Sequence, residues 1–225
     1  MNTIDIVVPA YIPTETHYEY LIKALESVQK QTFTDFNLIV IINGCDFTID
    51  HPIMSDKRFT QVTVTDKTNA ATARNYGIKQ GKAKYVAQLD ADDLYHEQKL
   101  EIQYDFMKKN DWCSLVGTHA YVIERDGRIT NSCYKSIHRT HEHIKRYIYQ
   151  ENPICCGSVL FRRSDIFDNN MFYNEKHKPG SIWPQYDRSM NEDWDLWIRC
   201  IESDKKIHLL PDRLYYWRRD SGVER

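Results

Sequence analysis

The sequence predicts an α/β fold with a Rossmann-like, doubly wound and mostly parallel sheet. Segments with strand composition alternate along the chain with segments whose apolar residues recur at helical spacing. Residues 36–42 are almost continuously apolar, which is typical of a parallel strand covered on both faces. The chain has 225 residues, of which 41% are hydrophobic, so we expect one globular domain over residues 1–225.

In the first half of the chain, strands and helices alternate. We expect strands at 4–9, 36–42, 59–64 and 85–89, with helices near 20–28, 70–78 and 96–109 between and after them. Thr68 or Asn69 is the expected N-cap of the second helix, and Gly81 closes that helix. No glycine-rich loop follows the first strand, which argues against a P-loop and against a dinucleotide-binding fingerprint.

The second half is predicted to be less regular. We expect strands at 112–117 and 154–161, a hairpin that turns at Asp126-Gly127, and closing strands at 206–210 and 214–217. Residues 167–185 read as a long loop over a groove, and Asn191 as the N-cap of a helix over 192–199. His138, His141 and His143 indicate a solvated helix start rather than a metal site, because no acid or cysteine completes a ligand set.

Charge and composition narrow the classes of function and compartment. The formal net charge is −2, so nucleic acid is not an expected partner. No apolar run reaches the length of a membrane span, and the N-terminus lacks the basic region of a signal peptide. The six cysteines form no Cys-x-x-Cys pair. We therefore expect reduced thiols and a cytoplasmic protein.

Three carboxylates stand within four residues at the end of the fourth predicted strand, in Asp90-Ala91-Asp92-Asp93. If the strand conformation persists, Asp90 and Asp92 point the same way, and the repulsion between them favours a divalent cation with oxygen ligands. Open α/β sheets also place their ligands at such strand ends. The alternative is a solvated acidic turn in which Asp93 caps the following helix.

Four segments together resemble glycosyltransferase family 2, whose members have the GT-A fold. They are Ile6-Val7-Val8-Pro9-Ala10-Tyr11, Ala70 to Ile78, Leu89-Asp90-Ala91-Asp92-Asp93, and Asn191 to Trp197. The third resembles the family's Asp-x-Asp motif and the fourth its Glu-Asp motif. The resemblance covers nearly the whole chain, and the order and spacing of the segments are more specific than any one of them.

The resemblance implies a role for each matching residue. Asp193 corresponds to the general base and Glu192 to a neighbour that orients the acceptor or the base. Asp92 would bind Mn²⁺ or Mg²⁺ together with the donor diphosphate, and Asp90 would contact the ribose and support the metal. The remaining residues implied in binding the nucleotide sugar are Pro9, Ala10, Tyr11, Arg74 and Ala91.

Two positions depart from the family pattern. Asn43 stands in the turn after the second strand, where an acidic residue that contacts the base is usual, so the preference for uridine is open. Near the C-terminus, Arg218-Arg219-Asp220 replaces the family's Arg-x-His. Three interpretations are open: Asp220 is an oxygen ligand for the metal, Arg218 and Arg219 instead face the phosphates, or the segment is a solvated tail.

The expected function is transfer of a sugar, with inversion, from a nucleotide-diphosphate sugar, most simply a UDP-sugar. The acceptor would be a hydroxyl of a glycan or lipid-linked molecule, as in surface polysaccharide synthesis. Residues 1–110 would bind the donor, and the smaller acceptor-side region would be 111–225. A lipid-linked acceptor would bring peripheral contact with the inner face of a membrane. The alternatives are a catalytically silent nucleotide-sugar or glycan-binding module and a sugar nucleotidyltransferase, although the latter would need a glycine-rich basic loop after the first strand.

Overall fold

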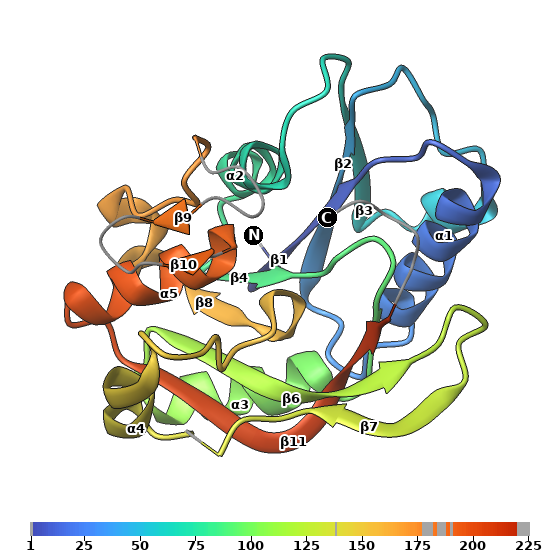
Figure 1. Cartoon of the computed structure of the whole chain (residues 1–225). Helices are drawn as coiled ribbons and strands as arrows, with labels where there is room; N and C mark the ends of the chain where they lie inside the picture. The colour runs from blue at the N-terminus through green and yellow to red at the C-terminus, as the bar shows by residue number, and fades with distance from the viewer. Residues whose placement is uncertain (1, 138, 177–181, 184–187, 190, 220–225) are drawn as a thin grey trace.

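A computed structural model describes residues 2–137, 139–176, 182–183, 188–189 and 191–219. Its central sheet has the strand order β3-β2-β1-β4-β8-β6-β11-β5, and β7 pairs with β6 (Figure 1). The strands are β1 Ile4–Ala10, β2 Phe36–Asn43, β3 Phe59–Val64, β4 Tyr85–Gln88, β5 Leu94–Tyr95, β6 Leu115–Ile123, β7 Ile129–Tyr134, β8 Leu160–Arg162 and β11 Ile207–Arg218. A separate two-stranded sheet pairs β9 Ile182–Trp183 with β10 Arg188–Ser189.

The sheet is mostly parallel, as predicted. Strands β1 to β4 pair in parallel with one another, and β6 and β11 also form a parallel pair. Strand β8 lies antiparallel between β4 and β6, so β6 and β11 run in the same direction as β1. The carboxyl ends of β1, β2 and β4 therefore meet at one edge of the sheet.

Helices cover both faces of the sheet. Helices α1 Glu15–Gln29 and α3 Lys99–Lys109 pack on one face, and α2 Ala70–Gln80, α4 His141–Tyr147 and α5 Glu192–Glu202 pack on the other (Figure 1). Short 3₁₀ turns complete the described structure at Pro52–Ser55, Cys156–Ser158, Arg163–Asp165 and Phe167–Asn169.

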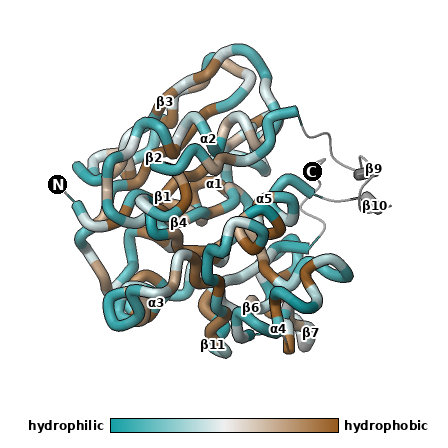
Figure 2. Tube along the Cα trace, turned by 90° about the vertical axis from the view of Figure 1, so that its left-hand side faces the viewer, coloured by the Kyte–Doolittle hydropathy of each residue, from teal (hydrophilic) through white to brown (hydrophobic). Residues whose placement is uncertain are grey.

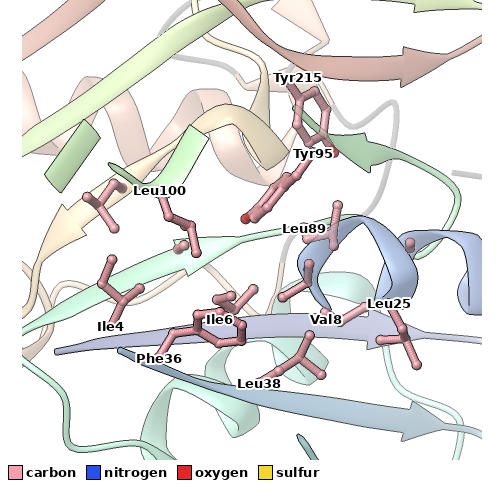
Figure 3. Packing of buried hydrophobic residues seen from close by; sticks show 14 of the residues in the cluster. Ile4, Ile6, Val8, Leu25, Phe36, Leu38, Leu89, Tyr95, Leu100 and Tyr215 are labelled. Atoms are coloured by element: carbon pink, nitrogen blue, oxygen red, sulfur yellow. The ribbon is translucent and has the colours of Figure 1, made fainter. Parts of the chain in front are cut away.

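The two faces have separate hydrophobic cores. The core under α1 and α3 contains Ile6, Val8, Leu89 and Tyr215, among others (Figure 3). The second core contains Trp197 and Phe161, whose ring centroids are 5.8 Å apart. In Figure 2 the brown, apolar stretches lie in the interior, along the central strands, and the teal stretches lie outside.

A lysine side chain, Lys99, lies in the first core. Lys99 is 0% exposed, donates from Nζ to Oε1 of Gln103 at 2.8 Å, and lies 4.1 Å from the ring centroid of Tyr95. Burial lowers the pKa of Lys99 well below the ordinary lysine value. Gln103 in turn donates to the carbonyls of Val116 and Ser158, so this pair connects α3 to the sheet.

The structure confirms the predicted elements of the first half and the hairpin that turns at Gly127, whose φ is 88°. Asn69, rather than Thr68, accepts from the N–H of Thr72 and caps α2. Gly81 closes α2 in an extended conformation, with φ −83°, rather than in the left-handed one. Glycine suits this position because a Cβ there would overlap the carboxylate of Asp5.

Several predicted bounds were wrong. The predicted strand at 112–117 begins at Leu115 and continues to Ile123, and the one at 154–161 is reduced to Leu160–Arg162 after a 3₁₀ turn. The two closing strands are one strand, β11, with irregular pairing around Pro211. The two-residue strand β5 was not predicted.

The helix predicted to start at the histidine cluster is α4. His141, however, is buried rather than solvated, and its Nδ1 accepts from the N–H of Ile207. His138 lies outside the described residues, as do 177–181 and 184–185 of the loop that was predicted over 167–185. The described part of that segment begins with the 3₁₀ turn Phe167–Asn169. No helix in the described part of the chain is both long and apolar enough to cross a membrane.

Candidate active site

The residues predicted to bind the donor gather where β1, β2 and β4 end. Ala10 pairs with Ile42, so Tyr11 and Asn43 follow side by side at the ends of β1 and β2. Strand β4 pairs with the other edge of β1, and the carboxylates follow its last residue, Gln88. This is the edge at which open α/β sheets bind ligands.

The acidic segment is a turn rather than a continued strand. The N–H of Asp93 donates to the carbonyl of Asp90 at 3.1 Å, so the alternation expected for an extended segment ends at β4. The interpretation of Asp93 as a helix cap is wrong, because its side chain is 0% exposed and accepts from Tyr215 and Arg218. We call residues 90–93 the acidic turn.

Strand β11 fixes this turn from the far end of the chain. The hydroxyl of Tyr215 donates to Oδ2 of Asp93 at 2.8 Å, and the N–H of Arg218 donates to Oδ1 at 2.6 Å. The buried guanidinium of Arg218 donates to the carbonyl of Asp92 at 2.7 Å and to the carbonyls of Glu124 and Arg125. These contacts give Arg218 a structural role in the turn.

A glycine makes room for the tyrosine of this arrangement. A Cβ on Gly157 would overlap the hydroxyl and ring of Tyr215. Tyr215 could then no longer reach Asp93 in its present position, so the 3₁₀ turn before β8 also shapes the acidic turn.

Arg74 connects the acidic turn to helix α5. Its Nη2 lies 2.7 Å from Oδ1 of Asp90, and its Nη1 donates to Oε1 of Glu192. The residue is 6% exposed, and its guanidinium carbon lies 5.5 Å from the ring centroid of Tyr173. The structure thus brings together three residues that stand in three separate sequence motifs.

Asp193 lies beside this ion-pair group and is 7% exposed. Its Oδ1 accepts from the N–H of Trp194 at 2.7 Å, and its Oδ2 accepts from Nδ2 of Asn152 at 3.2 Å. Burial, and then the charge of Glu192, raises the pKa of Asp193 to about 7, although Arg74 and the two hydrogen bonds oppose the shift. A carboxylate with this pKa has the properties of a general base that works near neutral pH.

Two buried polar groups beside the turn have no hydrogen-bond partner among the described residues. They are the Nε of Arg74 and the side-chain amide of Gln88, which is 0% exposed and precedes the turn by two residues. Buried N–H and C=O groups are rarely left unpaired in native proteins. The Nε of Arg74 is therefore a buried donor beside the acidic turn that has no acceptor among the described residues.

Asn43 and Tyr11 both lie at the site, but they differ in how much of the side chain remains open to contact a ligand. Oδ1 of Asn43 accepts from the N–H and the hydroxyl of Thr68, and Nδ2 donates to the Thr68 carbonyl at 2.9 Å. Tyr11 is 36% exposed, and the Nζ of Lys67 lies 4.1 Å from its ring centroid. Tyr11 therefore offers an open aromatic face, whereas Asn43 already bridges two loops.

The described residues suit a divalent cation that is bound partly by a ligand better than one that is bound by protein side chains alone. The described residues contain no group of three or more His, Cys, Asp or Glu side chains arranged to bind a metal ion. Asp90 is paired with Arg74, and Asp92 is half-exposed in the turn. Mg²⁺ is usually bound by one or two carboxylates plus substrate phosphates, and Asp92 suits that role. Asp220, the tentative third ligand, lies outside the described residues.

Several residues of the site were not predicted from the sequence. They are Asn152, Tyr173, the structural role of Tyr215, and Asn75. The amide of Asn75 exchanges hydrogen bonds with the backbone of Tyr173, at 2.8 and 3.0 Å. The position of Asn75 directly after Arg74 was a usable signal, whereas the others follow no local pattern.

The fold and the site together define an α/β protein with an acidic turn at the carboxyl edge of the sheet and a buried carboxylate, Asp193, on helix α5 beside it. The sequence model of glycosyl transferase family 2 matches residues 5–170. The chain therefore belongs to glycosyltransferase family 2 and is a glycosyltransferase of the GT-A fold.

Relatives and solved structures agree with this assignment. The chain is 26% identical over 230 residues to the uncharacterized glycosyltransferase MJ1057 of Methanocaldococcus jannaschii, covering 99% of this chain and 73% of that protein. It is 32% identical to TarP of Staphylococcus aureus, a poly(ribitol-phosphate) β-N-acetylglucosaminyltransferase, over 74% of this chain and 46% of TarP.

The structure of Staphylococcus aureus TarS residues 1–349 in complex with UDP-GlcNAc superimposes with a TM-score of 0.73 at 19% identity. The match covers 98% of this chain and 60% of that structure, so the relatives extend beyond the part that this chain resembles.

Proposed function

We propose that the chain transfers a sugar from a UDP-sugar to a hydroxyl of a glycan or lipid-linked acceptor, with inversion at the anomeric carbon and with a divalent cation, Mn²⁺ or Mg²⁺. The observation that carries the proposal is Asp193, a buried carboxylate whose pKa is raised to about 7 beside the Arg74 ion-pair group. A group with that pKa is poised to take a proton near neutral pH.

On the acceptor side, Asp193 takes the proton of the attacking hydroxyl. The hydroxyl oxygen forms a bond to the anomeric carbon while the bond from that carbon to the diphosphate oxygen breaks. A single displacement of this kind inverts the anomeric configuration. The hydrogen bonds from Trp194 and Asn152 orient the carboxylate of Asp193 for the proton transfer.

On the donor side, the acidic turn and Arg74 bind the nucleotide diphosphate. A divalent cation, when bound with Asp92, would neutralise charge on the leaving diphosphate. The unpaired Nε of Arg74 would donate to a donor oxygen, and its ion pairs with Asp90 and Glu192 keep the guanidinium in place. Tyr11, Pro9, Ala10 and Ala91 would line the base and ribose.

The choice of uridine rests on a relative and not on Asn43. The TarS structure contains UDP-GlcNAc, which supports a UDP-sugar as donor here. Asn43 uses its amide on Thr68, so a base bound beside it would be read by backbone groups or by Tyr11. The name of TarP, a poly(ribitol-phosphate) β-N-acetylglucosaminyltransferase, supports an acceptor that is a polymer.

The decisive experiment is Asp193→Asn, which preserves the shape of the side chain and removes its basicity. We expect UDP-sugar binding near that of the wild type and transfer slower by about 10²–10⁴-fold, the usual contribution of a general base. The matched control is Glu202→Gln at the other end of α5, where Oε1 accepts from the Tyr149 hydroxyl. Transfer would be followed with a UDP-sugar panel and the product configuration by NMR.

Two results would contradict the proposal: near-normal transfer by Asp193→Asn, or a product with retained configuration. The rival hypothesis of a silent nucleotide-sugar-binding module predicts donor binding without any turnover. A wild-type protein that binds UDP in calorimetry but neither transfers nor hydrolyses any sugar of the panel would favour that rival.

A further inference from the structure

One part of the sheet face that carries α4 and α5 is open. Ile207 and Leu209, at the start of β11, are buried in the second core. Helix α4 packs beside this end of β11 (Figure 1). Further along the same face, Tyr216 of β11 pairs with Tyr121 of β6, and both side chains are half-exposed. The face therefore changes from covered to accessible midway along the two strands.

The exposed aromatic rings on this part of the face are stacked. The ring centroids of Tyr121 and Tyr216 are 5.2 Å apart with an interplanar angle of 18°, and His96 stacks on Tyr216 at 6.5 Å and 23°. The guanidinium carbon of Arg213 lies 5.3 Å from the ring centroid of Tyr121. In this stack Tyr121 and Tyr216 each cover one ring face of the other, and the Arg213 guanidinium lies beside the Tyr121 ring.

Three exposed cations, Lys135, Arg139 and Arg213, lie around His119, which precedes Tyr121 by two residues on the same face of β6. Arg213 pairs with His119 in the β11–β6 register, and Lys135 follows Tyr134, which pairs with Ala120, so Lys135 is opposite His119 on the other side. Burial, and then the charges of Arg139, Arg213 and Lys135, lower the pKa of His119. All three cations are exposed. We call Tyr121, Tyr216, Lys135, Arg139 and Arg213 the aromatic–basic surface.

This surface lies next to the acidic turn. Tyr216 precedes Arg218 by two residues, which is about 7 Å along a strand, and Arg218 donates to the carbonyl of Asp92. Tyr216 and Arg218 both belong to β11, which continues to Arg218, so the surface and the contact with the acidic turn lie on the same strand. A chain molecule with one end at the acidic turn could therefore extend over the aromatic–basic surface.

We propose that the aromatic–basic surface binds the acceptor away from its reacting hydroxyl, and that the acceptor is a sugar or polyol chain that carries phosphate or carboxylate groups. The inference rests on the proposed function for the position of the donor at the acidic turn. The half-exposed tyrosine side chains offer apolar ring atoms to the carbon backbone of a sugar or polyol and hydroxyl groups to its oxygens. Arginine and lysine side chains bind phosphate and carboxylate through charge-assisted hydrogen bonds.

The test measures binding directly and needs no turnover. Fluorescently labelled oligomers of glycerol phosphate, of galacturonic acid and of neutral dextran are titrated with the wild-type protein and two variants. Lys135→Gln/Arg213→Gln removes two cations of the surface. Lys108→Gln/Lys109→Gln removes two exposed cations of α3 and is the matched control, since Lys108 also lies beside a tyrosine ring, that of Tyr104.

We expect the wild type and the Lys108→Gln/Lys109→Gln control to bind one or both anionic oligomers more tightly than dextran, and added salt to weaken that binding. Lys135→Gln/Arg213→Gln should bind the anionic oligomer on the order of tenfold or more weakly, the effect of losing two charge-assisted contacts. The preferred oligomer distinguishes phosphate from carboxylate. Equal loss in both variants, or dextran binding as tight as that of the anionic oligomers, would overturn the proposal.

A second variant and a second measurement keep the two proposals separate. Tyr216→Leu keeps an apolar side chain at its position and should weaken binding while leaving the circular dichroism spectrum unchanged. Slow hydrolysis of UDP-sugar without acceptor should be the same in wild type and in Lys135→Gln/Arg213→Gln. If no protein hydrolyses or transfers the donor while the oligomer data are as expected, the proposed function fails, and the surface is then a site for anionic oligomers but not an acceptor site.

Discussion

At the scale of the residue, Asp193 shows how surroundings set the chemistry of a side chain. Its place in the motif beside Glu192 was visible in the sequence, but its burial and its hydrogen bond with Asn152 were not. The same holds for Asp93, which the sequence placed beside two candidate ligands and the structure places under Tyr215. Residue types identified the site, whereas their separate roles depended on contacts distant in sequence.

The raised pKa of Asp193 has a consequence for stability. In the folded protein Asp193 stays protonated up to about pH 7, while in the unfolded chain it ionises near pH 4. The folded state therefore binds the extra proton between these values, and its stability is lost as pH rises from about 4 to 7. The loss is on the order of 4 kcal/mol at most, since one pKa unit corresponds to about 1.4 kcal/mol.

We therefore expect Asp193→Asn to be more stable than the wild type at pH 8 and to lose this advantage toward pH 4. Urea unfolding at a series of pH values measures it, with Glu202→Gln as the control. Curves for wild type and Asp193→Asn that remain parallel from pH 4 to pH 8 would show that the carboxylate has an ordinary pKa.

The half-exposed carboxylate of Asp92 is the residue on which cation dependence is expected to rest. Asp92→Asn should weaken UDP binding in the presence of Mn²⁺ by about tenfold or more, because a neutral amide is a poorer ligand for a divalent cation. Calorimetry with Mn²⁺ and with a chelator separates the contributions. If the chelator has no effect on the wild type, the metal role is wrong, whatever the variant does.

At the scale of the element, the strands that the sequence predicted best are those covered on both faces. Strand β2 is a continuous apolar run, and its predicted and observed bounds differ by one residue. Strands β5 and β8 have two and three residues, too few to show any periodicity, and their pairing depends on partners far along the chain. The irregular pairing of β11 around Pro211 made one strand read as two.

The last residue of β11 provides a test of how that strand supports the acidic turn. Arg218→Gln removes a buried guanidinium that donates to three carbonyls, and leaves those carbonyls unsatisfied. We expect a loss of about 2–4 kcal/mol in the free energy of unfolding and weaker UDP binding. Arg128→Gln, an exposed arginine of the hairpin, is the control. Unchanged UDP affinity in a folded Arg218→Gln protein would show that the turn does not depend on β11.

At the scale of the whole molecule, one sheet passes through both halves of the chain. Strand β8 of the second half pairs with β4 of the first, and β5 of the first half pairs with β11 of the second. The alternation of strands and helices predicted the parallel part of this sheet, but no local pattern predicted these long-range pairs. The division into donor-binding residues 1–110 and acceptor-binding residues 111–225 stays a prediction about function.

The buried side chain of Lys99 makes the free energy of unfolding of the whole protein depend on pH. Because the pKa of Lys99 is lowered in the folded protein, the unfolded chain binds a proton that the folded state does not, and stability rises with pH up to the unfolded value of about 10.4. Lys99→Met should therefore stabilise the protein most at low pH and least near pH 9. Urea unfolding at pH 6 and 9 tests this against Lys108→Gln in the same helix. A constant difference at both pH values would contradict the expectation.

The contacts that fix the acidic turn join residues 122 and 125 positions apart, Asp93 with Tyr215 and Asp93 with Arg218. During synthesis on the ribosome, the three carboxylates emerge long before the strand that secures them. Until β11 has left the exit tunnel and paired with β6, the nascent chain has the acidic residues but not their geometry. If the turn binds the donor as proposed, we expect this capacity to arise late in synthesis and to be absent from a chain interrupted before Tyr215.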